Sequence, residues 1–286
     1  MEKLCFAAPA AFDAACGFGC ATLSPIQNGA ACERAVYPRA LDMECLTGDY
    51  EALLAGAEQA AARRGQPFVT VVVFGNAGGE NAFLRRLRGV LTGPMVGGGA
   101  AFDAGHGPAL IPGGGQAALA LIYDARYAYR TQTKCIHETL VDTCRLELAD
   151  ARTIRAINGA DAAQYLREQK QALGLRETDF EHLTLCDALG VNAHLSLDGG
   201  VVKSGRDLAP EMTLRYVAPE AAYDAIRAFY DDPDAIVFGC AGLGGLLDRP
   251  LGTPSLGLFL FGEVCTVAGT AEFGNLMLSK LQITPK

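Results

Sequence analysis

A cysteine and a glutamate stand at the ends of two apolar runs, in positions from which their side chains can do chemistry. The run Ala235–Phe238 is followed by a glycine and then Cys240, and the run Leu256–Phe261 is followed by a glycine and then Glu263. Both runs are short and consist of residues that suit buried strands. Because the ends of buried strands in α/β proteins carry binding groups, we expect this thiol and this carboxylate at the rim of a sheet.

The chemistry open to the thiol depends on its neighbours. A nucleophilic cysteine needs a histidine close to it in space. The chain has four histidines, all far from Cys240 in sequence: His106, His137, His182 and His194. No serine stands at a Gly-x-Ser-x-Gly elbow, which argues against serine hydrolase chemistry. An enzyme that uses Cys240 or Glu263 is therefore an alternative and not the main prediction.

The carboxylate of Glu263 raises a different question. A charged group at the rim of a sheet, if partly buried, needs a hydrogen-bond donor or a cation, because an unpaired buried charge is costly. Three partners are open to it: Arg249, a backbone amide of the loop, and the amine of a ligand.

The order of these elements resembles the C-terminal half of the FIST domain, a family of sensory domains thought to bind small ligands. The resemblance rests on a strand, Cys240, a glycine-rich loop, a second strand, Gly262-Glu263 and the downstream Asn275. The family has an arginine shortly after the Cys-Ala-Gly sequence, where this chain has Leu243, and the nearest substitute is Arg249.

The resemblance implies ligand sensing rather than turnover, with an amino acid or related metabolite as ligand. No kinase, cyclase, receiver or DNA-binding signature accompanies it, so any signal would pass to a separate protein partner. Some FIST proteins are thought to bind haem. A haem-based gas sensor is therefore an alternative, with His106, His137 or His194 as the axial ligand; otherwise no cofactor is expected.

The glycines near these side chains complete a predicted ligand pocket, since glycine lets the backbone approach a ligand closely. Glu263 and Asn275 would orient the ligand through hydrogen bonds, and Arg249 would hold a carboxylate if one is present. The predicted pocket consists of Cys240, Gly242, Gly244, Arg249, Glu263 and Asn275, with Asn76, Gly97, Gly98 and Gly99 from the other half of the chain.

The elements that position this pocket are predicted from apolar runs. Val69–Phe74 and Ala235–Gly239 should both be central, buried strands because their apolar runs are continuous. Asp49 and Gly65 are the predicted N-cap and C-cap residues of a helix over Tyr50–Arg64. Residues 178–188, in the second half of the chain, are expected to form a short helix.

The same order of elements occurs twice, which indicates a weak internal duplication. Asn76 follows its strand as Cys240 follows the later one. The sequence therefore predicts a mixed α/β (α+β) fold of two pseudo-repeated halves, residues 1–130 and 131–286, each with buried sheets flanked by helices.

Composition narrows the partners. The net charge is −8, from 24 basic and 32 acidic residues, which argues against nucleic acid as a partner. No run of 18 apolar residues occurs, so no membrane span is expected. The ten cysteines are scattered and form no Cys-x-x-Cys pair, so we expect reduced thiols without disulfides in a cytoplasmic protein.

Overall fold

The first of two central sheets has six strands, and its middle is built from strand–helix–strand units. The computed structural model describes residues 1–8, 18–22, 25–27, 30–75, 78–100 and 115–286. The strand order in the first central sheet is β22 (Thr270–Gly274), β21 (Glu263–Val267), β8 (Met95–Gly99), β7 (Val69–Phe74), β9 (Ala117–Ile122) and β6 (Met43–Gly48). The hairpin β21–β22 comes from far along the chain and completes the sheet at the edge of β8.

The second central sheet repeats this order. Its strands are β10 (Tyr127–Cys135), β23 (Met277–Pro285), β19 (Ala235–Cys240), β20 (Leu256–Leu260), β3 (Ile26–Gln27) and β4 (Ala30–Ala31). β19 pairs in parallel with β20 and antiparallel with β23, as β7 pairs in parallel with β8 and antiparallel with β9. The element order noticed in the sequence therefore corresponds to a repeated strand topology.

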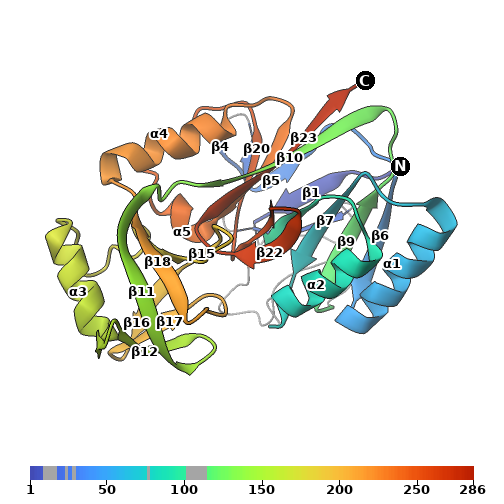
Figure 1. Ribbon diagram of the computed structural model, residues 1–286. Coiled ribbons are helices and arrows are strands. Elements are labelled where there is room, and N and C mark those ends of the chain that lie inside the picture. The colour runs from blue at the N-terminus through green and yellow to red at the C-terminus, as the bar shows by residue number, and fades with distance from the viewer. Residues whose placement is uncertain (9–17, 23–24, 28–29, 76–77, 101–114) are drawn as a thin grey trace.

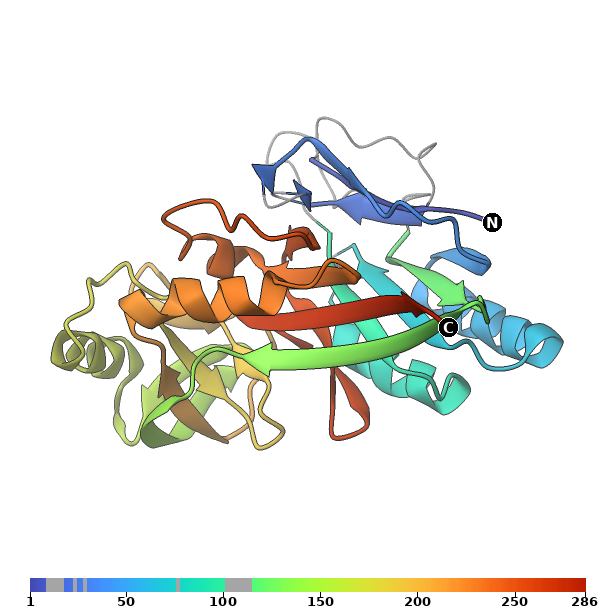
Figure 2. The ribbon, with the colours of Figure 1, turned by 90° about the horizontal axis from the view of Figure 1, so that it is seen from above.

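The inner faces of the two central sheets share one apolar core. Side chains alternate between the faces of a strand, so Val69, Val71 and Val73 of β7 pack in this core with Phe238 of β19. A third sheet joins them, formed by β2 (Phe18–Ala21), β1 (Leu4–Ala7) and β5 (Arg34–Val36). It lies as a separate layer over the central sheets in Figure 2, and Phe6 of β1 meets Phe238 edge to face with ring centroids 6.1 Å apart.

Helices cover the outer faces of the central sheets (Figure 1). α1 (Tyr50–Arg64) and α2 (Glu80–Val90) pack on the first central sheet, while α4 (Pro219–Tyr230) and the single turn α5 (Ala241–Gly244) pack on the second. The side chain of Asp49 accepts a hydrogen bond from the amide of Ala52 at 2.8 Å, which satisfies one of the free donors at the start of α1. None of the helices in the described residues is long and apolar enough to cross a membrane.

A separate unit of strands is inserted between β10 and α4, at the left of Figure 1. We call it the inserted unit. It contains β11 (Thr139–Asp150), β12 (Thr153–Ile157), β13 (Ala160–Asp161), α3 (Ala162–Ala172), β14 (Leu183–Cys186), β15 (Asn192–Ala193), β16 (Leu195–Asp198), β17 (Val201–Ser204) and β18 (Glu211–Tyr216). It has an apolar core of its own. The helix expected over residues 178–188 is wrong, because this stretch contributes β14 to a sheet with β15 and β18.

The predicted fold class is wrong. Among the residues that the structure describes, strands account for 46% and helices for 21%, and the several sheets include a nearly closed barrel, so the protein is not a helix-flanked α/β fold. Only the pairs β1–β2, β7–β8 and β19–β20 are parallel among the described strands. The physical reason is that the inner sheet faces pack on each other and on a third sheet rather than on helices. The inserted unit, whose strands lack long apolar runs, adds further antiparallel sheet.

The two strands on which the prediction depended are confirmed. β7 and β19 lie in the interior of their sheets, and every residue of both strands is buried. The expected boundary at residue 130 falls within β10, which pairs along its whole length with β23.

Candidate functional site

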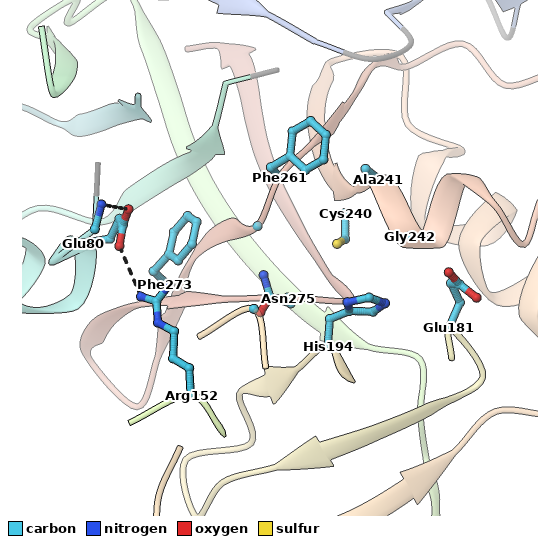
Figure 3. A pocket seen from close by; sticks show the side chains of 13 residues that line it. Glu80, Arg152, Glu181, His194, Cys240, Ala241, Gly242, Phe261, Phe273 and Asn275 are labelled. Atoms are coloured by element: carbon cyan, nitrogen blue, oxygen red, sulfur yellow. Dashed lines mark hydrogen bonds and ion pairs between the residues drawn. The ribbon is translucent and has the colours of Figure 1, made fainter. Parts of the chain in front are cut away.

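A cavity of about 480 Å³ lies where the central sheets and the inserted unit meet (Figure 3). Four segments line it: the start of α2, the inserted unit, the end of β19 with α5, and the chain from β20 to just beyond β22. The lining residues are Gly78, Glu80, Arg152, Glu181, His194, Gly205, Cys240, Ala241, Gly242, Phe261, Gly262, Phe273 and Asn275. Its volume lies within the range of about 300–1,000 Å³ that small-molecule sites occupy.

The repeated topology explains why the cavity is at this place. α2 follows the carboxyl end of β7, and α5 follows the carboxyl end of β19. Ligands in open α/β sheets bind outside the carboxyl ends of parallel strands. The two corresponding strand ends therefore contribute to one cavity, which the inserted unit borders on a further side.

Asn275 supplies a buried amide to the cavity. Only 6% of the residue is exposed, and its Oδ1 has no hydrogen-bond partner among the described residues. Gly205 makes room for this side chain, because a Cβ on Gly205 would lie 2.6 Å from Asn275 Oδ1. Buried amide groups normally have partners, so an unpaired one beside a cavity is a candidate ligand contact.

His194 and Glu181 lie near each other on the side of the inserted unit, facing Gly242. A Cβ on Gly242 would stand 3.5 Å from Cγ of Glu181 and 3.9 Å from Cδ2 of His194. Burial lowers the pKa of His194, so the imidazole is favoured in its neutral form, and its Nε2 has no partner in the part of the chain that the structure describes. No hydrogen bond or ion pair with another described residue holds the carboxylate of Glu181.

The opposite end of the cavity carries charges that are already paired. Nη2 of Arg152 lies 3.7 Å from Oε2 of Glu80, and its Nε donates to Asp207 at 2.7 Å. The amide of Gly78 donates to Oε1 of Glu80 at 2.9 Å. The contact between Arg152 and Glu80 joins the inserted unit to the start of α2 (Figure 3).

Cys240 and Glu263 are neighbours, and Glu263 is fully buried. The side chain of Cys240 points into the space between Phe261, Asn275 and His194 (Figure 3). Oε2 of Glu263 accepts a hydrogen bond from the amide of Met277 at 3.2 Å. Burial raises the pKa of Glu263 well above its usual value, which favours the neutral carboxylic acid.

The same burial makes Cys240 a poor nucleophile. Burial is the main cause that raises the pKa of the Cys240 thiol, and ionisation of Glu263 would raise it further, so the thiolate that would attack a substrate is disfavoured. The geometry thus supports contact between a ligand and a neutral thiol more than covalent catalysis by it.

The structure brings together some of the residues predicted from the sequence. Cys240, Gly242 and Asn275 line the cavity, and Glu263 lies buried next to Cys240. Gly244 packs against the ring of Phe259, which would lie 3.3 Å from a Cβ at this position.

The other predicted residues lie elsewhere. The guanidinium of Arg249 lies over the ring of Tyr223, 4.0 Å from its centroid, and the side chain is exposed. Arg249 is therefore no partner of Glu263. The glycines Gly97, Gly98 and Gly99 belong to β8, where Gly98 opposes Glu263 across the strand pair. Asn76 lies outside the described residues.

The three histidines considered as haem ligands do not lie together in one site. His106 lies outside the described residues. His137 is buried, with Nε2 at 2.8 Å from the carbonyl oxygen of Glu181 and Nδ1 at 3.4 Å from Nδ2 of Asn192. His194 lines the cavity. No group of three or more metal-binding side chains occurs among the residues described.

Sequence reasoning missed most of the wall that the inserted unit supplies: Arg152, Glu181 and Gly205. These residues stand in turns and loops with no motif around them, and only the tertiary fold brings them to Cys240. The sole sequence signal was the isolated His194 in an apolar segment. No model of a protein family matches this chain, and no curated protein matches it.

Proposed function

We propose that the protein is a ligand-binding sensory domain of FIST type, whose ligand is an amino acid or a related small metabolite. The observation that carries this proposal is the cavity of about 480 Å³ between the central sheets and the inserted unit, with Asn275 beside it, whose buried Oδ1 lacks a partner among the described residues. A buried polar group without a partner is costly, and a bound ligand would remove that cost.

Binding without turnover agrees with the chemistry of the side chains. The neutral thiol of Cys240 and the neutral acid of Glu263 are both held in the protonated form by burial. A binding site needs only placed donors and acceptors within an apolar wall. Any signal would then pass to a separate protein partner.

The contact between Arg152 and Glu80 suggests how ligand occupancy would be sensed. It joins the inserted unit to α2 across the cavity at 3.7 Å, and both residues line the cavity. A ligand that contacts both parts would favour one arrangement of them, since a ligand shifts an equilibrium only through differential contacts.

A thermal-shift screen of amino acids and related metabolites tests the proposal. A ligand that binds only the native state raises its stability by RT ln(1 + [L]/Kd), about 2.7 kcal/mol at a hundred times Kd. We expect at least one compound to raise the melting temperature in a concentration-dependent way. Asn275→Leu should abolish that shift, while Glu58→Gln on the exposed side of α1 should preserve it. A complete screen without a shift would contradict the proposal.

A further inference from the structure

One wall of the cavity carries a negative charge that the protein leaves without a close counter-ion. The carboxylate of Glu181 has no hydrogen bond or ion pair with any residue in the described part of the chain. At the other end, Glu80 has Arg152, and Arg152 is shared with Asp207. One end of the cavity therefore carries a negative charge that is unpaired among the described residues, whereas the charges at the other end are paired with each other.

Lys170 is a candidate counter-ion for Glu181, because their charges interact, but its ammonium is bound elsewhere. The charges of Asp179, Glu181 and Glu177 act on the pKa of Lys170, but burial outweighs them and lowers that pKa to about 8. Its ammonium donates to the carbonyl oxygen of Glu177 at 2.7 Å and lies over the ring of Phe180. Lys170 thus reduces the negative potential at Glu181 without forming a pair with it.

The polar groups beside Glu181 are neutral. Asn275 is 6% exposed and has an unpartnered Oδ1, and Nε2 of His194 is also unpartnered among the described residues. In the view of Figure 3, His194 lies between Asn275 and Glu181. Rotation of the Asn275 amide by 180° exchanges its donor and acceptor without a change of shape, so it can present Oδ1 to a ligand that donates hydrogen bonds.

Aromatic rings complete the surroundings. Phe261 and Phe273 both line the cavity, with Phe273 beside Glu80 and Arg152 at the opposite end from Glu181 (Figure 3), and the face of a phenyl ring attracts a cation. The carboxylate of Glu181 and the neutral acceptors beside it suit an ammonium group, whereas they offer an anion no charge of opposite sign at this end.

We propose that the cavity binds its ligand through a primary ammonium group, with Glu181 as the counter-ion and Asn275 and His194 as neutral hydrogen-bond partners. The inference rests on the proposed function, and it names the chemical class that this site selects. It transfers to Glu181 the contact with a ligand amine that the sequence had suggested for Glu263.

The test uses three probes of equal length and different charge: n-butylammonium, 1-butanol and butyrate. Each is titrated into the full-length protein at constant ionic strength, and binding is followed by protein-observed NMR. We expect n-butylammonium to bind at least ten-fold more tightly than the other two, because hydrogen bonds to charged groups are the stronger ones. Glu181→Gln keeps the shape and should weaken n-butylammonium about ten-fold or more, while Glu58→Gln should leave its affinity unchanged.

Glu181→Lys gives a second, independent result. Glu181 is only partly buried, so its replacement should not prevent folding, which circular dichroism verifies. The reversed charge should abolish n-butylammonium binding and bring butyrate to the cavity.

The outcomes separate this inference from the proposed function. Equal or tighter binding of butyrate by the unmodified protein would overturn the ammonium assignment, as would unchanged affinity in Glu181→Gln. If the metabolite screen yields only anionic or neutral ligands at this cavity, ligand binding stands and the assignment fails. If neither metabolites nor probes bind, both fail.

Discussion

Replacement of Glu263 by glutamine should change the pH dependence of stability in a direction fixed by the structure. Glu263 is fully buried, and burial raises its pKa well above the usual value. The folded protein therefore keeps a proton that the unfolded chain releases above its ordinary pKa of about 4.3. Because the unfolded state binds fewer protons, stability falls as the pH rises between the unfolded and the folded pKa.

The magnitude follows from proton linkage. A difference of one proton changes the free energy of unfolding by about 1.4 kcal/mol per pH unit. Glutamine has the shape of the neutral acid, its Oε1 can accept from the amide of Met277, and it does not titrate. Relative to the unmodified protein, Glu263→Gln should therefore gain stability as the pH rises above the unfolded pKa, by up to about 1.4 kcal/mol per pH unit until Glu263 ionises in the folded protein.

Urea unfolding followed by circular dichroism measures this difference at each pH, with a shared m value for the two proteins. Other titrating groups cancel in the comparison, and the Cys240 thiol is neutral in both states over this range. Glu58→Gln on α1 is the control and should show a constant difference from the unmodified protein. A constant difference for Glu263→Gln, or one of opposite sign, would refute a neutral Glu263.

Three other predictions concern the backbone, the histidines and the thiols. Gly98→Ala should destabilise the protein by about 1–3 kcal/mol in urea unfolding, because a Cβ would lie 2.2 Å from the carbonyl oxygen of Gly262. Gly89→Ala in α2, where a Cβ meets nothing within 4 Å, should instead stabilise the protein by about 0.5–1 kcal/mol. Equal effects of the two substitutions on stability would contradict this prediction. Burial lowers the pKa of His137 to about 4, so its NMR signal should not titrate above pH 5, and a midpoint near pH 6.5 would count against its burial. All ten cysteines should react in a thiol titration of denatured, unreduced protein, as the nine free cysteines in the described residues indicate; a loss of two or more thiols would show a disulfide.

The predictions from the sequence were most accurate for elements whose conformation is determined by residues within the same stretch of chain. The apolar runs of β7 and β19 are buried on both faces, and such runs are continuous in sequence. Asp49 also predicts the start of α1 from local hydrogen bonding alone. These elements were recognisable because no distant residue decides their conformation.

The predictions that failed concern features that depend on packing between residues distant in sequence. Residues 178–188 form β14 because β18 and β15 pair with it, and tertiary pairing overrides local preference. Glu263 lies next to Cys240, but the sequence could not show that it would be fully buried with the backbone amide of Met277 as a hydrogen-bond donor. Glu181 reaches the site only through the inserted unit, which no pattern connected with Cys240.

The pairing of β10 with β23 affects how the chain can fold while it is being synthesised. Among the described strands, β10 (residues 127–135) pairs only with β23 (residues 277–285), and the hairpin β21–β22 pairs with the edge of β8 just as late in the sequence. During synthesis, both early strands emerge from the ribosome with unsatisfied backbone edges, which are templates for aggregation. The nascent chain should therefore depend on chaperones, and its folding should be slow because these contacts are so distant in sequence.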